Sequence, residues 1–188
     1  PPLLSPILAR RISAGQKMVI TGFTGPFTLD EKVRRDSEDI IHICAGSGIV
    51  PSYSIIKHNL RTNDKHRHKL IYSNKNFREI IFYHQLNELE QEYPERFKII
   101  HTLTRDKDNF SISDKIREGR ITKELIEKTI TNPERTAVFV CGPDRSIHQK
   151  KAAKERGEEL KHSFMNGVLS SIDEIGIPKN RVKKESYG

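Results

Sequence analysis

A short glycine turn is the clearest candidate for chemistry in this sequence. An apolar, β-forming run from Asp39 to Ala45 ends in Gly46, Ser47 and Gly48, with Pro51 shortly after. Glycines let the backbone approach a ligand closely, and the helix that follows offers unpaired N–H groups and the positive end of its dipole to a phosphate. Such a turn is typical of phosphorylated-ligand binding by an open α/β sheet. Because Pro51 replaces the last glycine of GxGxxG, a tight turn without a ligand stays an alternative.

A second apolar run ends in similarly small residues. Residues 136–140 lead into Cys141, Gly142 and Pro143. If this strand and the first one are central neighbours in a parallel sheet, their carboxyl ends flank the switch point and both turns face one crevice. We therefore expect Cys44 and Cys141 near the carboxyl ends of adjacent strands, both reduced. Cys141 is either a reactive thiol or a small buried hydrophobe, and the residues alone favour the second.

The elements that position these turns alternate between strand and helix. The β-rich runs are Asp39 to Ala45, Lys69 to Ser73, Phe97 to Leu103, Thr136 to Cys141 and Arg181 to Ser186. Apolar residues at helical spacing fill residues 51–60, 77–93, 121–130 and 164–175 between them. This pattern predicts an α/β fold with a five-stranded parallel sheet of order 3-2-1-4-5, Rossmann-like, with helices on both faces. Segments 105–119 and 144–161 are polar, and we expect both to be irregular. For 144–161 an exposed helix is an equal alternative.

The length suits one full domain, or one domain plus a piece of another, and the composition indicates a globular chain. The 188 residues are 35% hydrophobic and carry a net charge of +8, and no run of eighteen apolar residues predicts a membrane span. No secretory signal pattern stands at the beginning, and Cys44 and Cys141 lack metal-ligand or disulfide-framework spacing, so we expect a reduced protein of the cytoplasm.

Other charged and polar residues carry weaker signals. The basic run from His66 to Lys69 has no interleaved aromatic residues, so a solvated face is favoured over a nucleic-acid site. The eight histidines lack carboxylate or cysteine partners at ligand spacing, so no metal site is expected. Ser54 and Ser73 lack the context of a hydrolase nucleophile.

Four motifs in order carry a resemblance to a known family. They are "GPF" at Gly25–Phe27, "AGSGIVP" at Ala45–Pro51, "VCGP" at Val140–Pro143 and "ESYG" at Glu185–Gly188. Together they resemble the ferredoxin-NADP(H) reductase-like superfamily, which moves hydride from a nicotinamide cofactor to FAD and then passes electrons on. The segment "SNKNFREIIFYHQLNEL" is similar to the cytochrome b5 reductase and oxygenase-reductase branches.

The resemblance implies a role for each matching position. Around the pyrophosphate and the nicotinamide it places Gly46, Ser47, Gly48, Pro51, Cys141, Gly142 and Pro143. It places Cys141 near the hydride-transfer centre, and it places Glu185 and Tyr187 against the flavin ring, so these three are the expected catalytic residues. Ser5 matches the serine at the start of the helix that binds the flavin pyrophosphate. No catalytic base is required, because the cofactors carry the chemistry.

The resemblance also implies a division of the chain. Residues 1–30 correspond to the end of an FAD-binding β-barrel domain, 31–38 to a linker and 39–188 to the NAD(P)-binding domain. A partial barrel segment is therefore expected ahead of the sheet, and the alternation within residues 15–29 predicts an antiparallel strand followed by a turn and a short extended piece. The family's Arg-x-Tyr/Phe-Ser strand is not found in these residues, so the flavin is expected to be held largely by a domain upstream.

The residues after the second strand bear on cofactor choice. Ser73, Asn74, Lys75 and Arg78 are the candidates. A 2′-phosphate requires a nearby cation, which Lys75 or Arg78 supplies, whereas Asn74 resembles the NADH-preferring branch. NADH is favoured and NADPH stays open. The predicted function is an NAD(P)H-dependent flavin reductase module that serves a partner such as an iron-sulfur protein or an oxygenase. The alternative is a dinucleotide-binding or regulatory module without catalysis.

Overall fold

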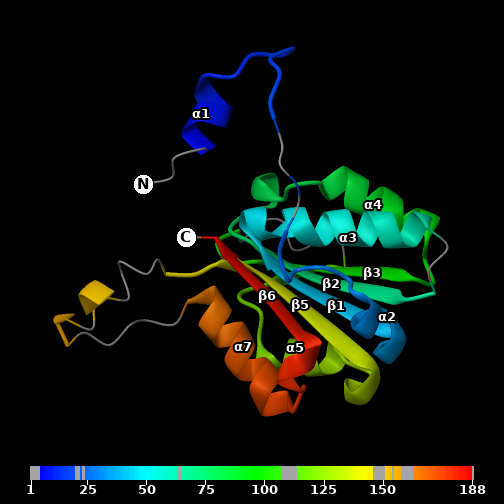
Figure 1. The fold of residues 1–188 in the computed structure, drawn as a ribbon. Coiled ribbons are helices and arrows are strands. Elements are labelled where there is room, and N and C mark those ends of the chain that lie inside the picture. Colours follow the sequence, from blue (N-terminus) through cyan, green and yellow to red (C-terminus); the bar gives the residue numbers. More distant parts are fainter. Residues whose placement is uncertain are drawn as a thin grey trace.

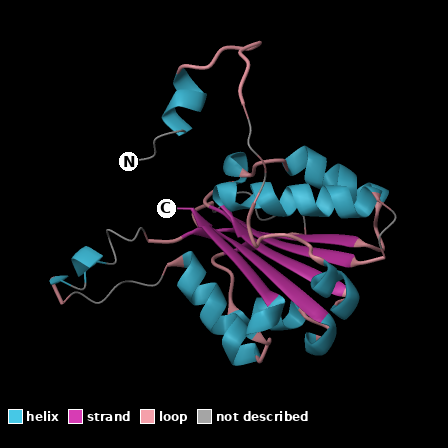
Figure 2. Ribbon diagram, in the orientation of Figure 1, coloured by secondary structure: helices cyan, strands magenta, loops and turns pink. Residues whose placement is uncertain are grey.

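The protein folds around one parallel sheet of six strands. A computed structural model describes residues 5–19, 22, 24–62, 65–106, 114–145, 151–153, 155–157 and 163–187. The sheet order is β4-β3-β2-β1-β5-β6 (Figures 1 and 2). Its strands are β1 (Asp39–Ala45), β2 (Arg67–Asn74), β3 (Phe97–Leu103), β4 (Ile116–Glu118), β5 (Thr136–Pro143) and β6 (Val182–Tyr187). The five predicted strands are present in the predicted order, and the sixth, β4, was missed.

The central strands are buried on both faces, as their continuous apolar sequences predict. Ile40, Ile41 and Ile43 of β1 have no exposed surface, and the same holds for Val138 and Val140 of β5. β1 pairs with β2 on one side and with β5 on the other, in parallel. Cys44 and Cys141 lie opposite one another in this register, both as free thiols, which confirms the expected topology.

Helices cover both faces of the sheet. α3 (Ile49–Arg61) and α4 (Tyr83–Glu92) lie on one face, and α5 (Lys123–Thr129) and α7 (Phe164–Ile175) on the other (Figure 1). Each pair closes its own apolar cluster, one around Ile56, Tyr72 and Leu86 and the other around Ile43, Val140 and Val168. Short 3-10 turns connect several elements: η1 (Gly46–Gly48), η2 (Phe77–Glu79), η4 (Pro133–Arg135) and η5 (Lys179–Arg181).

Residues before the sheet differ from the expectation. α1 (Ser5–Arg10) is helical and lies away from the sheet (Figure 1). Among the described residues between Arg11 and Asp30 none belongs to a strand, so the predicted antiparallel strand of a partial barrel is wrong for that part of the chain. A strand needs a hydrogen-bonded neighbour, and no described residue pairs with this segment. Phe27 nevertheless packs edge-on against Phe139, with ring centroids 5.1 Å apart.

The expected linker 31–38 contains a packed helix, α2 (Glu31–Asp36). Asp30 caps it, because Asp30 Oδ1 accepts a 2.9 Å hydrogen bond from the N–H of Val33. Val33 is buried, and Lys183 Nζ lies 2.6 Å from Asp30 Oδ2, which ties the helix start to β6. The division of the chain at 30 and 38 stays a prediction.

The two segments expected to be irregular are only partly described. Segment 105–119 contains β4, and residues 107–113 lie outside the described part. Glu90 holds this edge together, because its carboxylate accepts the N–H of Ile99 at 3.1 Å and pairs with Lys115 just before β4. Of segment 144–161, residues 146–150, 154 and 158–161 lie outside the described part, and 151–153 are helical.

The basic run at His66–Lys69 is not a solvated face, so that expectation is wrong. The run leads into β2, where neighbours rather than local polarity decide burial. His66 and His68 are buried, and His68 contacts both His42, at 3.1 Å, and Asn59, at 2.7 Å. Arg67 Nε binds Asp39 at 2.6 Å, and Lys69 Nζ donates to the carbonyl of Thr129.

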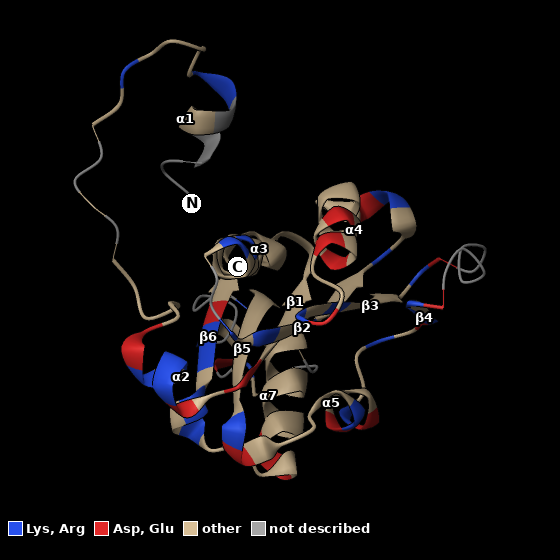
Figure 3. Cartoon of the chain, turned by 90° about the vertical axis from the view of Figure 1, so that its right-hand side faces the viewer, with Lys and Arg blue, Asp and Glu red and all other residues tan. Residues whose placement is uncertain are grey.

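Charges of both signs are mixed over the surface of the described chain. Figure 3 shows basic and acidic residues close together at α2 and β6, where Lys183 pairs with Asp30 and Arg35 with Asp36. Within the described residues, no helix combines the length and the apolar character needed to cross a membrane.

Acid should destabilise the fold through His101. Burial, with Lys115 nearby, lowers the pKa of His101 from 6.5 to about 4, so between these pH values the unfolded chain binds a proton that the folded chain does not. The free energy of unfolding therefore falls as the pH drops, by on the order of 3 kcal/mol over this window. His101→Phe should remove that part of the loss, measured by urea unfolding at pH 7 and pH 4.5. His84→Gln, at an exposed histidine, is the control, and an equal loss in both variants would contradict the prediction.

Candidate functional site

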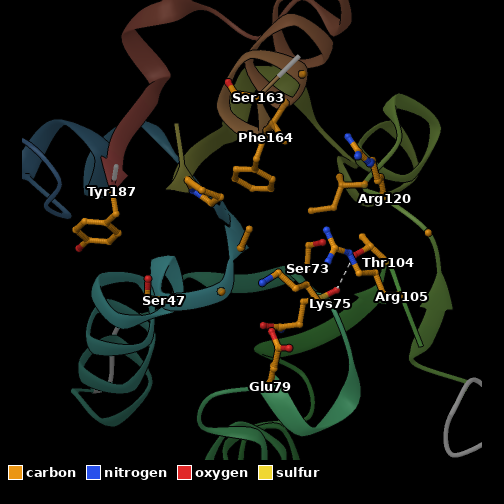
Figure 4. A pocket seen from close by; sticks show the side chains of 18 residues that line it. Ser47, Ser73, Lys75, Glu79, Thr104, Arg105, Arg120, Ser163, Phe164 and Tyr187 are labelled. Carbon is orange, nitrogen blue, oxygen red and sulfur yellow. Dashed lines mark hydrogen bonds between the residues drawn. The ribbon is translucent and has the colours of Figure 1, made fainter. Parts of the chain in front are cut away.

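A cavity of about 610 Å³ opens at the carboxyl ends of the strands. Parallel strands present their loops at this edge, which is where ligands of open α/β sheets bind. Figure 4 shows its side chains arriving from several elements. The lining residues are Ala45, Gly46, Ser47, Ser73, Asn74, Lys75, Glu79, Thr104, Arg105, Gly119, Arg120, Ile121, Pro143, Ser163, Phe164, Gly167, Val168 and Tyr187.

The glycine turn after β1 presses directly on the end of β5. Gly46 has a φ of +53°, a left-handed conformation that favours glycine. A Cβ on Gly48 would lie 2.2 Å from the carbonyl oxygen of Cys141, so no side chain fits there. The two turns identified in the sequence therefore meet. Gly46 and Ser47 line the cavity, whereas Gly48 supports it from behind, and Pro51 lies in the first turn of α3 without lining it.

The second turn is packed against the start of α7. A Cβ on Gly142 would lie 2.5 Å from the ring of Phe164, so the missing side chain makes room for that ring. Ser163 caps α7 by accepting the N–H of Asn166 at 3.2 Å, and its hydroxyl donates to Asp144 at 2.9 Å. Pro143 and Phe164 line the cavity, and Figure 4 shows the Phe164 ring between Tyr187 on one side and Arg120 on the other.

One end of the cavity is cationic. Lys75, Arg105 and Arg120 line it, together with the carboxylate of Glu79. The N–H of Arg105 donates to the carbonyl of Lys75 at 2.8 Å, which holds the loops after β2 and β3 side by side. Such a group of cations suits a phosphate. Arg78 was predicted for this role, but it lies in η2 and is not among the lining residues.

Asn74 has an unsatisfied donor in this wall. It is buried, with 6% of its surface exposed, and its Nδ2 atom lacks a well-aligned hydrogen bond among the described residues, although the Tyr72 hydroxyl lies near this amide. A buried donor without an acceptor costs free energy, so a ligand oxygen in the cavity would be bound there with a gain. Ser73 and Lys75 line the same wall.

The three residues predicted to be catalytic do not share one cavity. Tyr187 lines the main cavity and is 41% exposed, whereas Glu185 lines a separate one of about 250 Å³ with Thr24–Thr28 and Lys184. Cys141 has no exposed surface. Burial, with Glu185 nearby, raises the pKa of the Cys141 thiol to about 11, and burial raises the pKa of Cys44 to about 12. Both thiols are therefore protonated at neutral pH, which makes a nucleophilic role for Cys141 chemically unfavourable.

Sequence reasoning missed several lining residues. Arg105, Arg120, Glu79 and Phe164 were not singled out. Thr104 and Arg105 stand directly after the third apolar run, at the carboxyl end of a predicted parallel strand, and that position was the available signal. Ser5, predicted to bind the flavin pyrophosphate, begins α1, and its side chain lies outside the described part.

A methyl group at Gly48 should break the contact between the turns. Gly48→Ala forces its Cβ against the Cys141 carbonyl, so the free energy of unfolding should fall by about 1–3 kcal/mol, as for other overpacked sites. Gly167→Ala is the matched control, because its added Cβ meets nothing within 4 Å and it lies inside α7. Denaturant unfolding should show the control unchanged or more stable. A Gly48→Ala variant as stable as the wild type would refute the contact.

Comparisons with known proteins agree with this geometry. NADH-cytochrome b5 reductase 2-B of Vanderwaltozyma polyspora is 32% identical over 164 residues, which cover 86% of this chain and 52% of that protein. NADH-cytochrome b5 reductase 2 of Saccharomyces cerevisiae is 29% identical over 168 residues, with the same two coverages. The chain thus spans about half the length of the curated relatives it matches.

Solved structures share the fold. The cytochrome b5 reductase domain of Ulva prolifera nitrate reductase superposes with a TM-score of 0.62 at 21% identity, over 79% of this chain and 49% of that one. The CS-b5R domains of human Ncb5or, in the NAD+ form, superpose with a TM-score of 0.66 at 18% identity, over 97% of this chain and 45% of that one. Residues 42–151, more than half of the 188, match the family described as "Oxidoreductase NAD-binding domain". This chain belongs to the oxidoreductase NAD-binding domain family.

Proposed function

We propose that this chain is the nicotinamide-dinucleotide module of a flavin reductase that resembles NADH-cytochrome b5 reductase. The observation that carries the proposal is the contact between two glycine-containing turns, Gly46–Gly48 and Cys141–Pro143, each of which contributes residues to the lining of one cavity. The turn after β1 offers backbone N–H groups to the pyrophosphate of the dinucleotide. At the cationic end, Lys75 and Arg105 would bind the 2′-phosphate that NADPH carries and NADH lacks. The family and the named reductase relatives support the same activity.

FAD is the second cofactor of this proposal. When bound, FAD supplies a ring that accepts hydride from the nicotinamide and releases electrons singly to a partner. Tyr187 suits the edge of such a ring, because its side chain is 41% exposed at the end of β6 and lines the cavity. Glu185 and Gly25–Phe27 surround the small cavity beside it. The residues of this chain bind, orient and cover the reacting rings, and none has to transfer a proton.

The partner in this proposal is a one-electron redox protein. A cytochrome b5 is the first candidate, because the relatives are named as reductases of that protein. An iron-sulfur protein or an oxygenase, expected from the sequence, are the alternatives that an acceptor assay separates.

The function is tested on the protein that contains this chain. With NADH and supplied FAD, it should reduce ferricyanide and cytochrome b5. Tyr187→Ser should slow flavin reduction in single-turnover experiments and alter the nicotinamide affinity, while far-ultraviolet circular dichroism stays that of the wild type. No NADH-dependent reduction of any acceptor would overturn the reductase proposal. Binding of NADH without turnover would instead favour the non-catalytic module, which the burial of Cys141 and the separate position of Glu185 make the second candidate.

Cofactor preference should depend on the cations that line the cavity. The measured quantity is kcat/KM with NADPH divided by kcat/KM with NADH. Lys75→Ala and Arg105→Ala should each lower this ratio by about three- to tenfold, because each removes an interaction with a 2′-phosphate. Arg78→Ala is the control, because Arg78 does not line the cavity. If the ratio stays unchanged in both test variants, or changes equally in the control, neither cation reads a 2′-phosphate.

A further inference from the structure

A buried tyrosine hydroxyl holds the glycine turn from inside the protein. Tyr72 of β2 has no exposed surface, and its ring packs in the cluster between the sheet and the helices α3 and α4. Its hydroxyl donates a 2.9 Å hydrogen bond to the carbonyl oxygen of Gly46. Phenylalanine would fill the same space without a polar group to satisfy, so packing alone does not account for the hydroxyl.

The hydrogen bond fixes the orientation of one peptide plane. A trans peptide is planar, so the carbonyl of Gly46 and the N–H of Ser47 point in opposite directions. The Gly46 carbonyl points inward to Tyr72 and also accepts the N–H of Ile49. The Ser47 N–H therefore points away from Tyr72, and both Gly46 and Ser47 line the cavity.

The turn has reason to need such a restraint. Gly46 has a φ of +53°, and glycine populates left-handed and right-handed conformations almost equally, so the residue type itself does not hold this peptide in one orientation. Rotation would turn a carbonyl oxygen toward the cavity, where it would repel a phosphate. Burial raises the pKa of Tyr72 to about 12, so the hydroxyl keeps its proton at neutral pH.

We propose that Tyr72 is a positioning residue that aims the Ser47 N–H at a phosphate oxygen of the bound dinucleotide. The inference rests on the proposed function, because it names how that same cavity receives the pyrophosphate. Tyr72 touches no ligand in this proposal and acts through the Gly46–Ser47 peptide, for which the Ser47 amide signal is the specific readout, since the Tyr72 hydroxyl also interacts with the Asn74 side chain.

Tyr72→Phe tests the inference, because it removes the hydroxyl and keeps the buried ring. The 15N-labelled chain is titrated with ADP-ribose, and both the dissociation constant and the Ser47 amide signal are followed. We expect the variant to bind roughly three- to tenfold more weakly, the range of one neutral hydrogen bond. The shift of the Ser47 amide at saturation should shrink. Tyr83→Phe is the matched control, because Tyr83 packs against Phe77 and His101 away from the turn.

The outcomes distinguish a failure of the role proposed for Tyr72 from a failure of the proposed dinucleotide-binding function. If the wild type binds ADP-ribose and Tyr72→Phe binds it equally well with the same Ser47 shift, the inference is overturned and the proposed function stands. An equal loss in Tyr83→Phe overturns it too, because the effect is then general to the core. If the wild-type chain binds no ADP-ribose, the proposed nucleotide site itself fails, and the inference fails with it.

Discussion

The position of β1 between β2 and β5 is the constraint on which the rest of the structure depends. β1 pairs in parallel with both neighbours. Parallel neighbours need crossover connections, and these are right-handed. Because β2 and β3 are added on one side of β1 and β5 and β6 on the other, the connecting helices lie on opposite faces of the sheet. The α3–α4 layer and the α5–α7 layer follow from this arrangement. A crevice then forms where the loops diverge, at the carboxyl ends of β1 and β5.

The shape of the crevice depends on two glycines, where the absence of a side chain allows close packing. Gly48 lies against the carbonyl of Cys141, and Gly142 lies under the ring of Phe164. The close approach leaves one wall made of peptide groups, while Lys75 and Arg105 bring positive charge to the far end. The thiols of Cys44 and Cys141 are buried, and their raised pKa values keep them protonated at neutral pH. The cavity therefore suits phosphates and flat rings.

The sequence predicted the parts of the fold that depend on local apolar runs. The observed bounds of β1 and β3 are those expected, because each is a continuous buried run between turn residues. β4 was missed because three residues with polar neighbours become a strand only by pairing with β3. His68 was misplaced for a similar reason, since its burial depends on His42 and Asn59 from other elements.

The candidate site was predictable where it is made of backbone and less so where it is made of side chains. Gly46 and Gly142 could be identified from the sequence, because each is a glycine directly after or at the end of an apolar, β-forming run. The cations do not, because charged residues are common in this chain and only the folded loops decide that Arg105 faces the cavity while Arg78 does not. The same holds for Glu185 and Tyr187, which lie two residues apart on one strand yet line different cavities.

The most direct test of this account is a crystal structure of the chain with bound NAD+. The account predicts the pyrophosphate within hydrogen-bond distance of the Ser47 N–H, at the turn that meets Cys141, with the dinucleotide in the cavity lined by Lys75, Phe164 and Tyr187. A dinucleotide bound elsewhere, such as in the groove between α7 and β6 lined by Leu169 and Val182, would contradict it.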